Sequence, residues 1–174
     1  GSKLDAGPAF GTGEHATTEG CLAALDQLAK EGKKFRRILD MGCGSGILSL
    51  AAAKTWRTGI IACDIDPGAV RVARENVRQN GVGSFIYAQA GNGYRTPLGQ
   101  TKAPYDLIVS NILANPLCQM ARDLRCHINV GGMAILSGFL VRDARRVATH
   151  HVAVGLKLRQ KIVVDGWATL IMYR

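Results

Sequence analysis

The chain has 174 residues, of which 47% are hydrophobic and 20% charged, the size and composition of one globular domain with a buried core. Its net charge is +9 and its pI is near 9.7, a balance that permits anionic partners without proving them. The most apolar stretch, residues 47–53, is far too short for a helix to cross a bilayer.

The first half of the chain is predicted to alternate helices with short apolar strands. In chain order we expect a helix with the stripe Cys21, Leu22, Leu25 and Leu28, a strand over 36–40, a helix over 47–54, a strand over 59–64 and a helix burying Val70, Ala73 and Val77. Asp66 and Pro67 give this last helix an N-cap and a first-turn proline, and Gly81 suits its C-terminal cap.

The second half continues the alternation and ends in a hairpin. We expect strands over 84–88, 106–110 and 133–137, a helix carrying Leu117, Met120, Ala121 and Leu124, a helix over 141–151, and strands over 156–164 and 167–173. Asn115 and Pro116 repeat the cap-and-proline pair, whereas residues 91–101 are predicted to be the longest loop. Asp165-Gly166 is a strong two-residue hairpin signal.

This order of elements predicts the fold class. Strands that alternate with helices form a parallel sheet covered on both faces, and the terminal hairpin inserts an antiparallel strand. We therefore expect an α/β fold with a Rossmann-like seven-stranded sheet, mostly parallel, in which a C-terminal hairpin strand is antiparallel.

A glycine-rich loop lies between the first strand and the following helix. Within residues 39–46 the glycines Gly42, Gly44 and Gly46 permit a tight turn and let a ligand approach the backbone, while the helix N-terminus adds free N–H groups. Asp64 ends the next strand, where a carboxylate can accept hydrogen bonds from both hydroxyls of a ribose. The glycine loop and Asp64 together predict a nucleoside-containing ligand.

Two ligands compete for this arrangement. Dinucleotide sites favour G-x-G-x-x-G, whose third glycine would fall at position 47, which is Ile47 here. The sequence instead has G-x-G-x-G preceded by Asp40, the form typical of S-adenosylmethionine sites. A nicotinamide-dependent oxidoreductase is therefore the less favoured alternative.

Two further segments carry a resemblance to a known family. DAGPAFGTGEHATT at residues 5–18 and NILANPL at residues 111–117 resemble the ribosomal protein L11 methyltransferases. Together with Asp40 to Gly46 and residues 64–67, the resemblance runs in order along nearly the whole chain. Methyltransferases of adenine and other amines often carry N-P-P-Y or D-P-P-Y after the fourth strand, and the departure from that pattern over residues 112–114 matches the L11 family.

The resemblance implies a function and a set of site residues. The implied reaction transfers methyl groups from S-adenosylmethionine to protein amines of ribosomal protein L11, either lysine side chains or the N-terminal amine, with S-adenosylhomocysteine as product and no metal. The cofactor-binding residues expected on this basis and from the glycine motif are Thr18, Asp40, Gly42, Gly44, Gly46, Asp64 and Asn111. Asn111 is also the expected catalytic residue. Asn92 is a candidate partner for the adenine amino group, although an asparagine in a loop is more often a turn former.

The resemblance also implies the extent of the domain. Residues 3–174 are expected to form the catalytic domain, and the family's N-terminal substrate-docking domain is expected to be absent from this sequence. The open alternatives are a methyltransferase for another protein or a small molecule, and a non-catalytic cofactor-binding module.

Cysteine usage and charge clusters bear on location and partners. The five cysteines form no C-x-x-C pair and are odd in number, which argues against a zinc site or a disulfide framework and favours buried thiols in the cytoplasm. Basic residues cluster over 30–37, 71–78 and 142–146, but aromatic residues are not interleaved with them in the sequence. This spacing predicts no direct nucleic-acid binding, and the short apolar stretch over 47–53 predicts no membrane partner.

Overall fold

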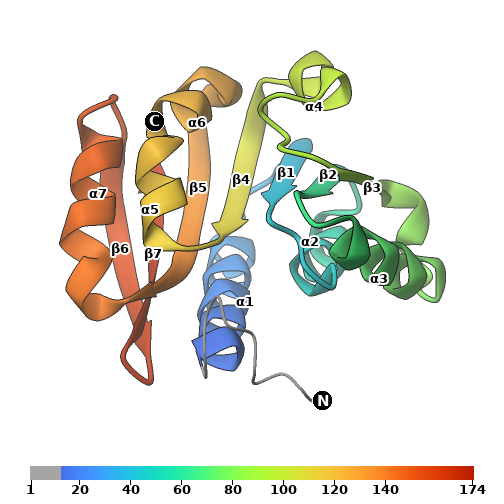
Figure 1. Cartoon of the computed structure of the whole chain (residues 1–174), viewed down its shortest axis with the longest axis horizontal. Coiled ribbons are helices and arrows are strands. Elements are labelled where there is room, and N and C mark those ends of the chain that lie inside the picture. The colour runs from blue at the N-terminus through green and yellow to red at the C-terminus, as the bar shows by residue number, and fades with distance from the viewer. Residues whose placement is uncertain (1–12) are drawn as a thin grey trace.

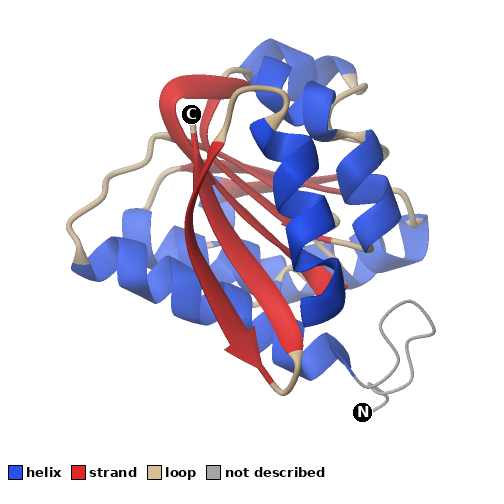
Figure 2. Cartoon of the chain, turned by 90° about the vertical axis from the view of Figure 1, so that its left-hand side faces the viewer, coloured by secondary structure: helices blue, strands red, loops and turns tan. Residues whose placement is uncertain are grey.

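The computed structural model describes residues 13–174, which form a seven-stranded sheet with helices on both faces (Figures 1 and 2). The strands are β1 (Arg37–Met41), β2 (Gly59–Asp64), β3 (Ile86–Ala90), β4 (Tyr105–Asn111), β5 (Ile128–Leu140), β6 (Lys157–Val164) and β7 (Trp167–Tyr173). The helices are α1 (Glu14–Lys30), α2 (Ile47–Trp56), α3 (Pro67–Arg78), α4 (Pro97–Lys102), α5 (Ala114–Gln119), α6 (Ala121–His127) and α7 (Ala144–Val152).

The strand order confirms the predicted fold class. The order is β3-β2-β1-β4-β5-β7-β6, with parallel pairing from β3 to β5 and antiparallel pairing of β7 with both of its neighbours. The chain runs outward from β1 to β3 and then returns to the other side of β1 with β4. Open α/β sheets bind ligands at such a switch point, outside the edge where the parallel strands end. We call this edge the carboxyl edge and the opposite one the amino edge.

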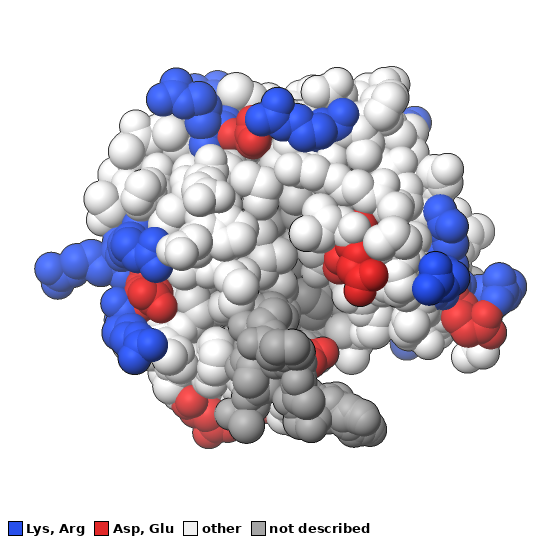
Figure 3. All heavy atoms as spheres, viewed as in Figure 1, with Lys and Arg blue, Asp and Glu red and all other residues white. Residues whose placement is uncertain are grey.

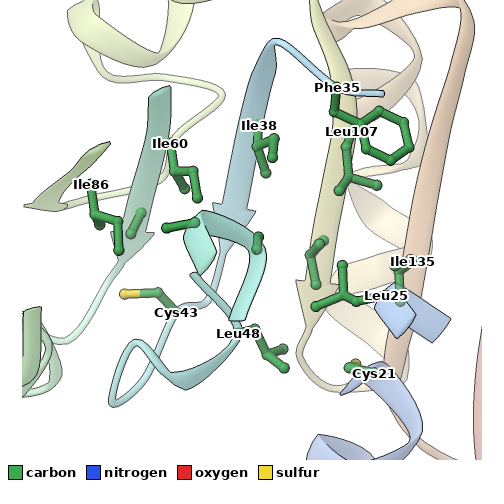
Figure 4. Close-up of a cluster of buried hydrophobic side chains, with 14 of the residues drawn as sticks. Cys21, Leu25, Phe35, Ile38, Cys43, Leu48, Ile60, Ile86, Leu107 and Ile135 are labelled. Atoms are coloured by element: carbon green, nitrogen blue, oxygen red, sulfur yellow. The ribbon is translucent and has the colours of Figure 1, made fainter. Parts of the chain in front are cut away.

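Each face of the sheet carries its own hydrophobic core. Helices α1, α2 and α3 cover one face, where Figure 4 shows Ile38 and Ile60 of neighbouring strands with Leu25 of α1 and Leu48 of α2. Helices α5, α6 and α7 pack on the other face around β4, β5 and β7. The predicted stripe of α3, formed by Val70, Ala73 and Val77, is buried as expected.

Two of the predicted local signals are confirmed in detail. The Asp66 side chain accepts a hydrogen bond from the Gly68 N–H at 2.9 Å and caps α3. At the tip of the β6–β7 hairpin, Asp165 and Gly166 have φ values of 49° and 80°, the positive pair that a type I′ turn requires. The hairpin fixes the register that inserts β7 between β5 and β6.

Three predictions about caps and loops are wrong. Gly81 is not a left-handed cap, since α3 already ends at Arg78 and Gln79 follows as its C-cap. Asn115 is not an N-cap, because α5 begins one residue earlier and the Asn115 side chain accepts from Arg146 Nη1 at 2.9 Å. The expected loop over 91–101 contains the start of α4, which Thr96 caps by accepting from the Gly99 N–H.

The cysteines confirm the expectation of buried thiols. Cys21, Cys43, Cys63 and Cys118 are buried and Cys126 is exposed, all of them free. Burial raises the pKa of Cys21 to about 12 and that of Cys63 to about 11, so both remain protonated at neutral pH. Over residues 13–174, no helix is both long and apolar enough for a membrane span.

Candidate active site

A cavity of about 440 Å³ opens at the carboxyl edge, at the switch point of the sheet. Gly42, Gly44, Asp64 and Asn111 all line it, although they come from three different strand ends. The parallel pairing of β1 with β2 and β4 brings these ends together. Four of the seven residues expected from the sequence thus meet at one cavity.

The glycine loop bends where side chains are excluded. Gly42 has φ of +84°, and a β-carbon there would collide with the Cγ2 atom of Ile112. The Gly42 and Cys43 N–H groups both donate to the Cys63 carbonyl at 2.8 Å, which fixes the loop against the end of β2. Position 42 therefore requires glycine twice over: its φ is positive, and Ile112 leaves no room for a side chain. The backbone of Gly42 is exposed at the cavity wall as a result.

Asp64 presents a carboxylate of fixed orientation. One oxygen accepts the Gly44 N–H at 2.9 Å and the other accepts the Asp66 N–H at 3.0 Å. Each carboxylate oxygen can accept a second hydrogen bond, and the side chain lines the cavity. This arrangement suits a ligand with two adjacent hydroxyl groups. The next residue, Ile65, is 79% exposed at the rim of the cavity.

Asn111 ends β4 with an unused acceptor. Its Oδ1 atom is buried and has no hydrogen-bond partner among residues 13–174. Leaving such an acceptor unpaired costs about 1–3 kcal/mol, so a ligand N–H or O–H that reaches it would recover that free energy. Ile112 and Leu113 follow directly and make the neighbouring wall apolar.

Comparison with known proteins decides the family. A profile of the family described as "Ribosomal protein L11 methyltransferase (PrmA)" matches residues 2–174. Proteins named ribosomal protein L11 methyltransferase from Rhodopseudomonas palustris and Rhizobium etli are each 42% identical, over 172 and 168 residues, or 99% and 97% of this chain. The chain belongs to the ribosomal protein L11 methyltransferase family.

The chain spans 58% and 57% of the length of these two relatives. Among solved structures, the ribosomal protein L11 methylase of Lactobacillus delbrueckii subsp. bulgaricus is 29% identical, with a TM-score of 0.80 over 93% of this chain and 80% of that one. The magnesium protoporphyrin IX methyltransferase of Synechocystis PCC 6803 is 16% identical, with a TM-score of 0.71 over 90% of this chain and 80% of that one. The second likeness extends the shared fold beyond the L11 methyltransferase family.

Three of the expected cofactor-binding residues do not line the cavity of this L11 methyltransferase family member. Asp40 is buried between β1 and α2, where Ser49 Oγ donates to its Oδ2 at 2.6 Å and burial raises the pKa of Asp40 to about 6. Gly46 caps α2 next to Ala73 of α3. Thr18 is a partly exposed residue of α1. Because Asp40 is buried, it could affect the ligand only through the position of the glycine loop. The cofactor-binding roles of Asp40, Gly46 and Thr18 remain predictions.

Asn92 forms the expected turn and also lines the cavity. Its Oδ1 accepts the Tyr94 N–H at 2.8 Å, which forms the expected turn, while its Nδ2 donates to the sulfur of Met120 at 3.4 Å. Both Asn92 and Met120 line the cavity. Asn92 is therefore a turn former at the cavity, and its contact with the adenine amino group remains a prediction.

Sequence reasoning missed Gly138 and Met120. Gly138 has φ of +109°, and a β-carbon there would collide with the backbone of Ile112, so this glycine lets β5 support the strand end that carries Asn111. Met120 reaches the cavity only because the chain breaks between α5 and α6. Neither stands in a motif, so no linear signal could have found them. Residues 5–12 of the first signature segment lie outside the described residues. Within residues 13–174, no cluster of three or more His, Cys, Asp or Glu side chains could hold a metal ion.

Proposed function

We propose that this chain is an S-adenosylmethionine-dependent methyltransferase that acts on amines of ribosomal protein L11, either lysine side chains or the N-terminal amine. The names of its relatives support this substrate, and the cavity supports the cofactor. The observation that carries the proposal is the unpartnered Asn111 Oδ1 at the same cavity as Gly42 and Asp64. A ribosomal protein substrate is consistent with a cytoplasmic location, which we propose together with the function.

The residues present fit the cofactor. Asp64 offers two oriented oxygens to the ribose hydroxyls, and the open backbone at Gly42 allows close approach of the ligand. The apolar wall that includes Ile112 and Met120 suits the uncharged faces of the molecule. When bound, the cofactor supplies a methyl group on a positively charged sulfur, already activated for attack by a neutral amine.

The chain must then favour the neutral amine and align it. A lysine amine has an ordinary pKa of about 10.4, so most of it is protonated at neutral pH. The apolar wall around Leu113 and Pro116 disfavours the charged form by desolvation. Asn111 Oδ1 can accept an N–H of the neutral amine and turn its lone pair toward the methyl group. The remaining acceleration comes from holding nitrogen, methyl and sulfur in line.

The test compares two asparagines that differ in their surroundings. Asn111 lines the cavity, whereas Asn115 is an exposed residue of α5 whose side chain accepts a hydrogen bond from Arg146. Labelled methyl transfer to purified ribosomal protein L11 is followed by mass mapping of the modified amines. Asn111→Ala should reduce turnover at least tenfold with little change in melting temperature, whereas Asn115→Ala should keep wild-type turnover.

The same experiment separates the alternatives. Full activity in Asn111→Ala would remove this residue from catalysis. Methylation of a different protein or a small molecule, with none of the ribosomal protein, would reject the proposed substrate and replace it. Binding of NAD in preference to S-adenosylhomocysteine would reject the proposed cofactor.

A further inference from the structure

A second hollow, of about 320 Å³, lies at the amino edge of the sheet, opposite the candidate active site. Arg36 and Arg37 at the start of β1, Phe85 and Tyr87 around the start of β3, and Lys102 at the end of α4 all line it. We call these five residues and the hollow between them the amino-edge groove. In Figure 3, lysine and arginine side chains stand at the top of the molecule near α4 and α6 with an acidic side chain between them, and further basic groups stand at its left and right.

The positive charge of the amino-edge groove is not neutralised. Within the described part of the chain, Arg36, Arg37 and Lys102 form no ion pair with an acidic side chain. The acid beside them, Asp106, instead accepts the Arg36 and Arg37 backbone N–H groups at 2.7 and 2.9 Å. The three cations are exposed and remain available to an anionic ligand.

The backbone that carries these cations is held in place. The Arg37 guanidinium donates to the Lys102 carbonyl at 3.2 Å, which joins the start of β1 to the end of α4. Thr58 Oγ1 donates to the Arg36 carbonyl at 2.8 Å and ties the same segment to the start of β2. The Arg37 side chain is therefore preorganised, and a fixed side chain loses less conformational entropy on binding than a free one does.

The fold also brings aromatic rings to these cations. Tyr87 is 52% exposed and lines the groove, and Phe85 lies beneath the Arg57 guanidinium, 5.1 Å from the ring centroid. About fifty residues separate Tyr87 from Arg36 in the sequence, so their linear spacing gave the expectation of no stacking surface. The pairing of β1 with β2 and of β2 with β3 removes that separation.

We propose that the amino-edge groove binds a short stretch of single-stranded RNA. Cations beside an exposed aromatic ring are the combination by which proteins hold unpaired nucleotides, with phosphates on the cations and a base stacked on the ring. Arg36, Arg37 and Lys102 receive the phosphates, and Tyr87 stacks on a base. RNA as the source of the strand rests on the proposed function, because a ribosomal protein substrate is met in the company of RNA.

The test measures binding of a fluorescently labelled ten-nucleotide uridine RNA by anisotropy over a range of salt concentrations. The variant Arg36→Gln with Lys102→Gln should bind at least tenfold more weakly. Loss of two phosphate contacts should also reduce the slope of log affinity against log salt by about 1.4, since each contact to a single strand contributes about 0.7. The matched control, Arg71→Gln with Arg145→Gln, removes two exposed charges on α3 and α7 and should change affinity less than twofold.

A second pair of variants tests stacking. Tyr87→Ala should weaken binding about fivefold or more, the effect of losing one base–aromatic stack, whereas Tyr173→Ala at the end of β7 should not. Equal weakening by the control variants, no binding of the RNA by the wild type, or equal binding of a duplex of the same length would overturn the proposal.

Titration of S-adenosylhomocysteine into the same variants keeps this proposal distinct from the proposed function. The groove variants should bind it as the wild type does, because their side chains line a different cavity. A wild type that binds S-adenosylhomocysteine but not RNA would reject only the RNA-binding proposal. Loss of cofactor binding with RNA binding intact would reject only the methyltransferase.

Discussion

The two edges of the sheet carry sites that are built in different ways. At the carboxyl edge, backbone geometry and two fixed side chains make the site. They are glycines with positive φ, a carboxylate held by two N–H groups, and a buried side-chain amide oxygen that has no partner among residues 13–174. At the amino edge exposed side chains make the site, on ordinary strand and helix ends. Substitution of a single glycine should therefore abolish ligand binding at the carboxyl edge. Binding at the amino edge should weaken in steps as charges are removed.

The largest expected effect comes from Gly42→Ala. The new methyl group places a side chain at a φ of +84° and collides with Ile112, so the loop or the Ile112 wall of the cavity must shift. We expect affinity for S-adenosylhomocysteine to fall more than a hundredfold in calorimetric titrations. Gly32→Ala is the control, because Gly32 has a similar φ of +81° with nothing within 4 Å of the added carbon.

Gly32→Ala should lower the free energy of unfolding by about 1–2 kcal/mol, the strain of a left-handed alanine, and leave the affinity unchanged. If Gly42→Ala behaved in the same way, close approach of Gly42 to a ligand would be ruled out, and the comparison between the two edges would lose its main support.

A smaller effect is expected from Asp64→Ala, compared with Asp66→Ala two residues later. Asp64 lines the cavity, so its loss should weaken cofactor affinity by about 1.5–3 kcal/mol, the value of hydrogen bonds to a charged group. Asp66 caps α3, so its loss should lower the free energy of unfolding by about 1 kcal/mol and leave affinity unchanged. Calorimetry and urea unfolding measure the two quantities, and a reversed pattern would exchange the roles assigned to these acids.

The smallest effect concerns Asp40 and appears as a pH dependence. Burial raises the pKa of Asp40 to about 6, so ionising it is penalised in the folded state. The wild type is free of this penalty below about pH 4 and acquires it as pH rises through 6. Asp40→Asn does not titrate, and Ser49 can still donate to its amide oxygen. Between pH 4.5 and 7 the wild type should lose about 1–3 kcal/mol relative to the variant in urea unfolding. A constant difference would contradict the shifted pKa.

The sequence predicted the parts of the molecule that depend on neighbours in the chain. Strand and helix alternation, the Asp66 cap and the Asp165-Gly166 turn are local, and all are confirmed. The caps predicted at Gly81 and Asn115 were wrong because the helices end or begin at other residues: α3 ends at Arg78 and α5 begins at Ala114. Asn115 had a partner thirty-one residues away in Arg146, which no local rule includes.

The candidate site was predictable only in part for the same reason. Gly42, Asp64 and Asn111 stand at strand ends, and the topology of a parallel sheet brings strand ends together. The support that Gly138 gives to Ile112, and the meeting of Tyr87 with Arg36, depend on packing and on strand order across the sheet. Those contacts have no signature in the linear sequence.

The most direct test of the central claim is amide hydrogen exchange of the chain with and without S-adenosylhomocysteine, read by mass spectrometry. Binding at the carboxyl edge predicts slower exchange over residues 42–46, 64–66, 91–92 and 111–113, the strand ends and loops at the cavity. Exchange over residues 33–37 and 84–87 at the amino edge should not change. Protection confined to the amino edge, or no protection at residues 42–46 under saturating ligand, would contradict the assignment of the cofactor site.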